Sequence, residues 1–192
     1  MATTPVFEMK PPWTPELLPV VQKEIEDYLD TIRLPFVLEV GSGWSTLWLA
    51  QIADVLHSIE HDPAWYAEVT RCLTNLENAC YACDTVLIAS VELTDKPGGI
   101  VRQIFSEGQE TCDLILIDCV DEERLPAICA SVSRLKRNGW LVVDDSHWEM
   151  FDGLQRIMFN MGFAEKIYSG QHTRKTGEVK YHQTTIFSRR FK

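Results

Sequence analysis

The sequence predicts an α/β fold, with a doubly wound sheet of seven mostly parallel strands, helices on both faces and an antiparallel hairpin at one edge. Five short apolar runs each alternate with a longer amphipathic segment, as strands and helices do in a parallel sheet. The last two apolar runs have no helical pattern between them, which indicates an antiparallel pair. A length of 192 residues suits a single domain over 1–192, with an N-terminal segment and helix over 1–33 and a sheet core over 34–192.

The N-terminal half is expected to hold three of the strands and the helices between them. Thr14 and Pro15 form a cap-plus-proline helix start, and apolar residues follow at spacings of three and four. These residues are Leu17, Val21, Ile25, Tyr28, Leu29 and Ile32. The pattern then predicts a strand over 36–40, a helix over 45–53, a strand over 55–59, a helix from Pro63 to about residue 78 and a strand over 85–89.

The C-terminal half continues the alternation with a short helix after Pro97 and a buried strand, "DLILI", over 113–117. A helix follows, ending at Asn138, and then a strand over 140–143; the apolar positions assigned to this helix are Leu125, Ile128, Val132 and Leu135. Ser146 and Glu149 form a capping-box pattern for the next helix. Its predicted buried residues are Phe151, Leu154, Ile157, Met158 and Met161. Strands near 163–168 and 181–188 close the fold, joined by the loop "SGQHTRKTGEVK".

Composition excludes several classes of protein. A net charge of −10 without a basic stripe argues against nucleic acid as the main partner. The sequence contains no run of about 18 apolar residues, so we expect no membrane span, and its N-terminus lacks the features of a secretory signal. The six cysteines form neither a disulfide framework nor a zinc pattern, which favours reduced thiols and a cytoplasmic protein.

The turn after the first strand carries the clearest functional signal, in the stretch "FVLEVGSGWSTLWLA" over 36–50. In a doubly wound sheet, ligands bind at the carboxyl ends of the strands, beside the first strand. Gly41 and Gly43 permit close approach of the backbone to a ligand, but Thr46 stands where a dinucleotide fingerprint has its third glycine. A carboxylate at Glu39 would repel a pyrophosphate and suits an ammonium group.

A second acid, Glu60, ends the second strand, where it can accept both hydroxyls of a ribose. One acid for an ammonium, one for a ribose and no phosphate site favour S-adenosylmethionine over NAD. An NAD(P)-dependent oxidoreductase and a non-catalytic cofactor-binding protein remain as alternatives.

At this point the chain resembles the class I S-adenosylmethionine-dependent methyltransferases, which have a Rossmann-like sheet. The resemblance rests on "LEVGSGWST", "HSIEHDP", "CDLILID" and "LKRNGWLVVDD", in that order. It implies a methionine-side pocket formed by Glu39, Gly41, Ser42, Gly43 and Ser45. Glu60 would hold the ribose, His61 would lie next to the ligand and Asp118 would lie near the reacting methyl group. Ser90 and Val91 fall at the adenine position, where many members carry an acid, so contacts there are left to backbone or apolar groups.

The small-molecule O-methyltransferases with a bound divalent cation offer one model for the chemistry. By resemblance to them, Asp118, Asp144 and Asp145 would supply three oxygen ligands for a cation such as Mg²⁺. Two departures count against this model: Asp145 stands where that branch usually has Asn, and no lysine closely follows Asp118. The same stretch also suits a helix cap, because short polar side chains satisfy free amides at helix starts.

His147 is the second catalytic candidate beside Asp118, since an imidazole titrates near neutral pH and follows the fifth strand. It can act as a general base for a hydroxyl proton, or it is simply an exposed residue in the first turn of a helix. Trp13, Trp44, Trp148 and the loop 169–180 are candidates to line the acceptor pocket. The chain offers no second substrate domain, so we expect a small-molecule acceptor; a homo-oligomer remains open.

Overall fold

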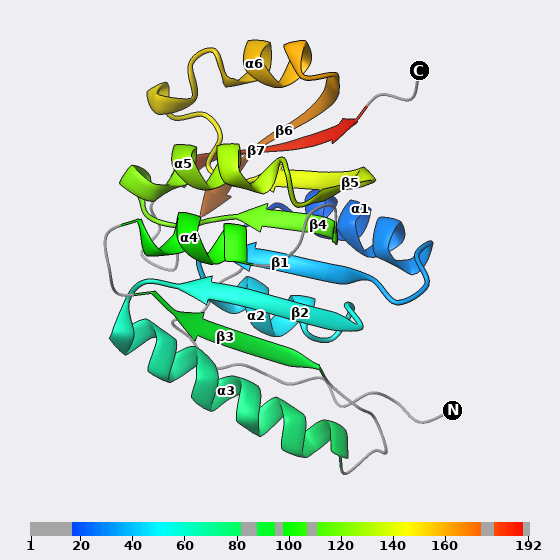
Figure 1. Cartoon of the computed structure of the whole chain (residues 1–192), viewed down its shortest axis with the longest axis vertical. Coiled ribbons are helices and arrows are strands. Elements are labelled where there is room, and N and C mark those ends of the chain that lie inside the picture. The colour runs from blue at the N-terminus through cyan, green and yellow to red at the C-terminus, as the bar shows by residue number, and fades with distance from the viewer. Residues whose placement is uncertain (1–16, 82–87, 95–97, 107–110, 174–178, 190–192) are drawn as a thin grey trace.

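The strands are arranged as the alternation predicts, in one seven-stranded sheet with the order β3-β2-β1-β4-β5-β7-β6. The computed structural model describes residues 17–81, 88–94, 98–106, 111–173 and 179–189. Strands β1 to β5 run parallel, and β7 lies antiparallel between β5 and β6 (Figure 1). The predicted fold class is therefore confirmed, including the antiparallel edge.

The N-terminal elements follow the predicted order closely. They are α1 (Pro19–Asp30), β1 (Phe36–Val40), α2 (Trp44–Leu49), β2 (Val55–Glu60), α3 (Pro63–Tyr81) and β3 (Ala89–Leu93). The predicted cap at Thr14 and Pro15 lies outside the described residues, but Val21, Ile25 and Leu29 are buried as their spacing predicts. The third strand was placed four residues early, and residues 85–87 of that prediction lie outside the described residues.

The C-terminal elements are α4 (Gly99–Ser106), β4 (Cys112–Ile117), α5 (Asp121–Ser131), β5 (Leu135–Val143), α6 (Leu154–Asn160), β6 (Phe163–Thr173) and β7 (Val179–Arg189). A 3-10 turn, Glu149–Phe151, precedes α6. The two strands of the hairpin are longer than predicted and absorb most of the expected loop over 169–180.

Two helix predictions in this half are wrong. Helix α5 ends at Ser131, because the Arg134 carbonyl accepts the amides of Thr111 and Cys112 and so turns the chain into β5, which contains Leu135. Apolar spacing alone could not detect this change from helix to strand.

The capping box at Ser146 and Glu149 does not form. Helix α6 begins instead after Gly153, whose φ of 84° is left-handed, and the Ser146 hydroxyl contacts Thr185 and the Gln183 carbonyl. As a result Ile157 and Met161 are exposed, whereas Phe151, Leu154 and Met158 are buried as predicted.

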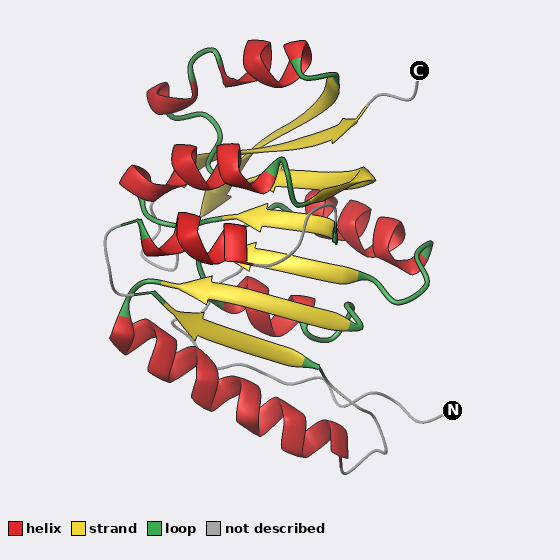
Figure 2. Ribbon diagram, in the orientation of Figure 1, coloured by secondary structure: helices red, strands yellow, loops and turns green. Residues whose placement is uncertain are grey.

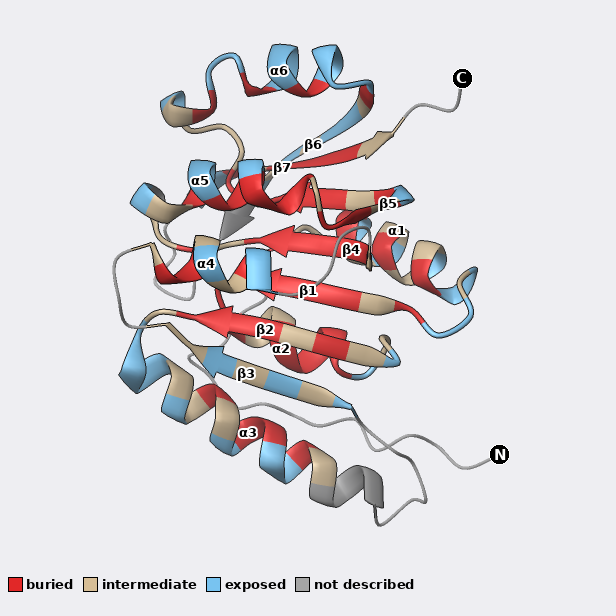
Figure 3. Cartoon of the chain, in the orientation of Figure 1, coloured by how far each residue is buried: buried red, intermediate tan, exposed pale blue. Residues whose placement is uncertain are grey.

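The helices cover both faces of the sheet (Figure 2). Helices α1, α2 and α3 pack on one face through residues such as Ile25, Trp48 and Leu73, whereas α4, α5 and α6 supply Ile104, Ile128 and other residues on the opposite face. Strands β1 and β4 lie between the two layers and are buried almost throughout (Figure 3). Polar groups at the carboxyl ends of these central strands are therefore held by a rigid, apolar support. No helix in the described ranges combines the length and apolar character that crossing a membrane requires.

Candidate functional site

The carboxyl ends of the central strands are tied together by backbone hydrogen bonds. The amides of Gly41, Asp118 and Asp144 each donate to the last residues of a neighbouring strand, at 2.8 to 3.1 Å. A cavity of about 390 Å³ opens at this edge. Its lining residues are Gly41, Ser42, Glu60, His61, Asp62, Trp65, Asp118, Cys119, Val120 and Arg124. Five of the predicted site residues therefore share one cavity.

Gly41 has a φ of 94°, and an added Cβ would lie 2.0 Å from the Asp118 carbonyl oxygen. No other residue fits there, because both the backbone conformation and the space require glycine. Gly43 differs: its φ is 178°, which is extended backbone, and an added Cβ would meet only the Trp65 ring at 3.8 Å. Gly41 thus serves the contact between the turn and β4 as well as lining the cavity.

Glu39 is fully buried beneath this turn and does not line the cavity. Its Oε2 accepts hydrogen bonds from the hydroxyls of Thr46, at 2.5 Å, and Ser58, at 2.6 Å. The Thr46 hydroxyl in turn accepts from the Gly43 amide, and the Ser42 hydroxyl contacts that of Ser58 at 2.7 Å. The carboxylate therefore braces both ends of the glycine turn through hydroxyl groups.

Burial raises the pKa of Glu39 to about 7, against the lowering effect of the Ser45, Ser58 and Thr46 hydroxyls. Its second oxygen, Oε1, is buried and has no hydrogen-bond partner in the part of the chain that the structure describes. Thr46, which sequence comparison with the dinucleotide fingerprint treats only as a missing glycine, is the residue that links this carboxylate to Gly43.

Glu60, at the end of β2, is 2% exposed and lines the cavity. Its Oε2 accepts the Ser42 amide and its Oε1 accepts the amides of His61 and Asp62, all at 2.8 Å. Three backbone donors fix this carboxylate without adding a positive side chain. The neighbouring His61 places Nδ1 2.9 Å from Glu60 Oε1 and lies at the cavity wall.

The remaining predicted cofactor residues are placed differently. Gly43 and Ser45 lie at the start of α2, beside the cavity but outside its lining. Ser90 pairs with His57 in the body of the sheet and is exposed, three residues before the end of β3. The structure does not bring Ser90 together with the other site residues, because the strand runs to Leu93. Trp65, from the first turn of α3, was missed by the sequence analysis; it lines the cavity and its indole donates to the Ser42 carbonyl.

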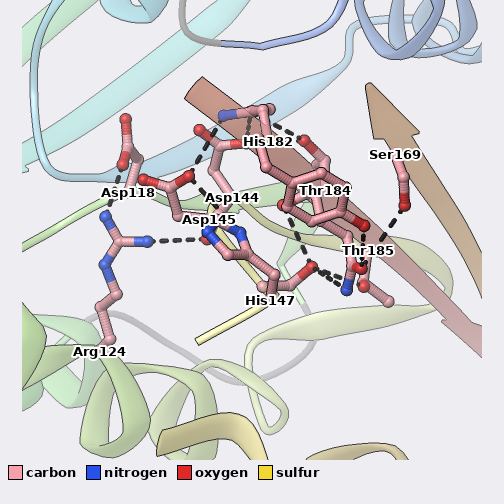
Figure 4. Close-up of polar contacts among 12 residues, drawn as sticks. Asp118, Arg124, Asp144, Asp145, His147, Ser169, His182, Thr184 and Thr185 are labelled. Atoms are coloured by element: carbon pink, nitrogen blue, oxygen red, sulfur yellow. Dashed lines mark hydrogen bonds and ion pairs between the residues drawn. The ribbon is translucent and has the colours of Figure 1, made fainter. Parts of the chain in front are cut away.

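Asp118, after β4, is paired with an arginine that the sequence analysis did not single out. Arg124 is 4% exposed, and its Nη2 donates to Asp118 Oδ1 at 2.8 Å. Its other nitrogens donate to the carbonyls of Cys119 and Asp144, the latter at 2.7 Å. One guanidinium therefore connects the ends of β4 and β5 (Figure 4).

Asp144 and Asp145, after β5, meet His182 from β7 (Figure 4). The imidazole places Nε2 2.9 Å from Asp144 Oδ1 and Nδ1 3.2 Å from Asp145 Oδ1. The Thr184 hydroxyl also donates to Asp144 Oδ1, at 2.7 Å. Burial lowers the pKa of His182, but its contacts with Asp144 and Asp145 outweigh that effect and raise the pKa to about 10.

These contacts do not fit a divalent-cation site. Asp118 is turned to Arg124, Asp144 is fully buried outside the lining of the cavity, and Asp145 faces His182. A hard cation needs several oxygen ligands directed at one point. Among the described residues, no group of three or more acidic, histidine or cysteine side chains is arranged to hold a metal ion.

His147 lies on a second cavity, of about 330 Å³. The lining residues are Ser146, His147, Trp148, Phe151, Asp152, Gly153, Leu154, Gln155, Tyr181, Gln183, Thr185 and Phe187. The His147 ring packs edge-on against Tyr181, and its Nδ1 lies 3.9 Å from Asp145 Oδ1, which is too long for a hydrogen bond. Of the predicted acceptor-site tryptophans, Trp148 lines this cavity, Trp44 lines neither cavity and Trp13 lies outside the described residues.

Arg124 joins the two cavities. It lines the first, and its guanidinium lies over the ring of Trp148, which lines the second, at 4.5 Å from the ring centroid. Such a stack holds an arginine in place through the electrostatic attraction of the ring. Asp118 and His147, the two predicted catalytic residues, therefore lie on different cavities with the Arg124–Trp148 pair between them.

Comparison with known proteins agrees with this architecture. The sequence matches the family described as "Methyltransferase domain" over residues 38–146, more than half of the 192-residue chain. No curated protein sequence matches it.

Among solved structures, an O-methyltransferase from Bacillus cereus in complex with SAH has 17% identity and a TM-score of 0.64, covering 91% of this chain and 82% of that one. TomG, an O-methyltransferase of tomaymycin synthesis from Streptomyces achromogenes in complex with SAM, has 15% identity and a TM-score of 0.61, with 90% and 81% covered. An rRNA methylase from Streptococcus thermophilus has 14% identity and a TM-score of 0.61, with 87% and 95% covered.

At these identities the solved structures support the fold, whereas the family match over residues 38–146 includes all four sequence motifs, three of which contribute residues to the first cavity. The chain belongs to the class I S-adenosylmethionine-dependent methyltransferases.

Proposed function

We propose that the protein binds S-adenosylmethionine in the first cavity and transfers its methyl group to an oxygen of a small-molecule acceptor in the second. The observation that carries this proposal is a pair of cavities, one lined by Glu60 and Asp118 and the other by His147, linked by the contact of Arg124 with Trp148. The family membership favours this function over a nicotinamide-dependent oxidoreductase.

The charge of the first cavity suits this cofactor. Glu60 accepts three backbone amides and has the His61 imidazole 2.9 Å from Oε1, and it lines the cavity, where its carboxylate can accept the ribose hydroxyls. Glu39 lies directly behind the turn and adds a second acid near the methionine side. A cofactor with a sulfonium and an ammonium group is favoured at such an edge, and a pyrophosphate is disfavoured.

Methyl transfer is an in-line displacement at the sulfonium carbon. The acceptor oxygen forms a bond to the methyl carbon, the carbon–sulfur bond breaks with its electron pair moving to sulfur, and the acceptor proton leaves to a base. The protein must align oxygen, carbon and sulfur, and must take up that proton.

His147 is the better base of the two candidates. Asp118 Oδ1 is already engaged in an ion pair with the buried Arg124, at 2.8 Å. His147 lies on the cavity proposed for the acceptor, and its Nδ1 has no hydrogen-bond partner among the described residues. We therefore assign Asp118 a positioning role: it pairs with Arg124, which in turn stacks on the ring of Trp148 at the second cavity.

The second cavity favours a small aromatic or partly apolar acceptor with hydroxyl groups. Its volume of about 330 Å³ lies at the lower end of the range for small-molecule sites. Trp148, Phe151 and Tyr181 offer apolar rings, and Ser146 and Gln183 offer polar groups beside His147. The net charge of −10 argues against a ribosomal RNA acceptor.

The first test is a thermal melt of the purified protein with S-adenosylmethionine, S-adenosylhomocysteine and NAD in separate samples. A ligand at about a hundred times its Kd stabilises by about 2.7 kcal/mol, which raises the Tm of a chain of this size by roughly 5–10 °C. We expect this shift with both sulfur nucleotides and none with NAD. The absence of a shift with either sulfur nucleotide would contradict the proposal.

The second test screens acceptors by measuring S-adenosylhomocysteine formation, with phenols, catechols, other small alcohols and ribosomal RNA as separate arms. We expect turnover in a small-molecule arm and a loss of about a hundredfold or more in His147→Gln, against a smaller loss in Asp118→Asn. Turnover in the RNA arm alone would overturn the acceptor class. Tight cofactor binding without S-adenosylhomocysteine formation in any arm would favour a non-catalytic protein.

A further inference from the structure

Two basic side chains pair with the three carboxylates that the sequence suggests as metal ligands. Arg124 reaches Asp118 with a donor–acceptor distance of 2.8 Å, and His182 reaches Asp144 and Asp145 at 2.9 and 3.2 Å. Both ring nitrogens of His182 face carboxylate oxygens, so one imidazole lies between the two aspartates.

We propose that this internal pairing replaces a divalent cation: His182 is a positioning residue for Asp144 and Asp145, and methyl transfer proceeds without a metal ion. The proposal rests on the methyl transfer proposed above. It concerns how the edge of the acceptor cavity is held in place, whereas cofactor binding depends on the first cavity.

The position of His182 follows from the length of β7. The pairing of β5 with β7 ends at Val143 and Thr185, and β7 extends past that point. His182 and Thr184 lie on this extension, opposite the residues that follow β5, and both contact Asp144 Oδ1. The antiparallel hairpin thereby brings an imidazole across the end of a parallel strand.

The pairs are too enclosed for a metal ion to replace them readily. His182 is 3% exposed, Asp144 is fully buried, and Arg124 is 4% exposed under the ring of Trp148. A divalent cation would have to remove His182 or Arg124 from its carboxylate, leaving that basic group buried without a counter-charge. Arg124 and His182 therefore supply part of the positive charge that a metal ion would otherwise bring to the three carboxylates.

The same hairpin controls the position of His147. Asp145 has a φ of 48°, an uncommon conformation for a residue other than glycine, and it faces His182. The next residue is held on both sides: the Ser146 amide donates to the Gln183 carbonyl at 2.8 Å, and its hydroxyl contacts Thr185. His182 therefore helps to hold Asp145 in place, and His147 lies two residues after Asp145 in the same turn.

The first test measures Mn²⁺ binding to the full chain after dialysis against EDTA, by electron paramagnetic resonance, with and without S-adenosylhomocysteine. We expect no saturable site at millimolar Mn²⁺, and turnover of the acceptor found in the screen that chelation changes by less than about twofold. Stoichiometric Mn²⁺ binding that Asp144→Asn abolishes, or turnover that needs added Mg²⁺, would overturn the proposal. Because Mn²⁺ binding is read independently of the cofactor, a failure to bind S-adenosylhomocysteine would count against the proposed function alone.

The second test uses His182→Gln and His182→Ala, with His57→Gln as the matched control on β2. We expect His182→Gln to keep its Kd for S-adenosylmethionine while kcat falls by about ten- to a hundredfold, because the turn that carries His147 shifts. Added imidazole should restore part of the turnover of His182→Ala, which a general loss of packing would not permit. Unchanged kcat in His182→Gln, or equal losses in kcat and in cofactor affinity, would contradict a positioning role. If His182→Ala does not fold, the Gln variant alone decides.

Discussion

The carboxylates on the two sides of the sheet edge are satisfied in opposite ways. At the ends of β1 and β2, Glu39 and Glu60 are held by hydroxyl groups and backbone amides. At the ends of β4 and β5, Asp118, Asp144 and Asp145 are held by Arg124 and His182. A neutral donor satisfies a carboxylate oxygen without bringing a positive charge, whereas a basic side chain places a positive charge next to the carboxylate.

The comparison separates Glu60, which lines the cavity and can meet a ligand, from acids that serve the structure, and the fully buried Glu39 belongs with the latter. In the sequence the two glutamates and the three aspartates look alike, because each is an acid at or just after the end of an apolar strand. What distinguishes them is the partner: hydroxyl groups and backbone amides for the two glutamates, and the side chains of Arg124 and His182 for the three aspartates. Each prediction below changes one carboxylate or one of its partners.

The largest effect is expected from His182→Ala, which leaves Asp144 and Asp145 buried without their imidazolium. Removing one partner of a buried ion pair costs about 3–5 kcal/mol of unfolding free energy. Urea unfolding measures this loss. The control His57→Ala, at an ion pair whose Glu92 partner is 46% exposed, should lose no more than about 1 kcal/mol. Equal losses in the two variants would show that His182 is not a special member of the cluster.

Glu39 is expected to make stability fall as the pH rises. Its pKa of about 7 in the folded protein lies above the ordinary value of 4.5, so the folded state holds the proton more tightly. The contribution of Glu39 is therefore greatest below pH 4.5 and is lost as the pH rises through 7. The loss amounts to about 3 kcal/mol. Urea unfolding across this range should show the slope in the natural protein and a flatter curve in Glu39→Gln; parallel curves would place its pKa near the ordinary value.

Glu60→Gln should weaken S-adenosylmethionine binding about ten- to a hundredfold, since each hydrogen bond to a charged acceptor contributes about 1.5–3 kcal/mol. Gln is a cleaner change than Ala, because Ala would leave three backbone amides without their acceptor. Titration calorimetry measures the affinity. Glu92→Gln, on the neighbouring β3, is the control and should bind as the natural protein does. An unchanged affinity in Glu60→Gln would remove this carboxylate from the cofactor site.

The smallest effect is expected from Thr46→Val, which removes the hydroxyl between Glu39 and the Gly43 amide. The two lost hydrogen bonds should cost about 1–2 kcal/mol of stability, with little change in side-chain volume. Thr74→Val on the surface of α3 is a matched control, expected to change stability by less than about 0.5 kcal/mol. Denaturant unfolding of both variants tests whether the hydroxyl braces the turn.

The sheet was predictable from the sequence because each strand is bounded by its own local signals. The acid at the end of β2 and the one at the end of β4 could be placed on one edge for the same reason, and Glu60 and Asp118 do share a cavity. Errors arose where a local pattern continued past a change of structure. Leu135 kept the helical spacing of α5 although it belongs to β5, and Ser90 was assigned to a strand end that lies three residues further on.

The partners of the acids could not be predicted from the sequence. His182 lies 38 residues from Asp144, and only the crossing of β7 over the end of β5 brings them together. Arg124 is six residues from Asp118, but nothing in the spacing indicates that its side chain turns back toward β4. The strand predicted near 181–188 is present in β7, yet the role of His182 depends on the pairing register.

The contact between Gly41 and the Asp118 carbonyl has a consequence for relatives of this chain that share the same turn. A relative that had lost its cofactor would still need glycine at this position, because a side chain there would push apart two central strands. Activity could thus disappear while the best-known part of the motif stayed intact. Diagnosis of an inactive relative should therefore begin with His147, which lines a cavity and whose Nδ1 makes no hydrogen bond within the described part of the chain.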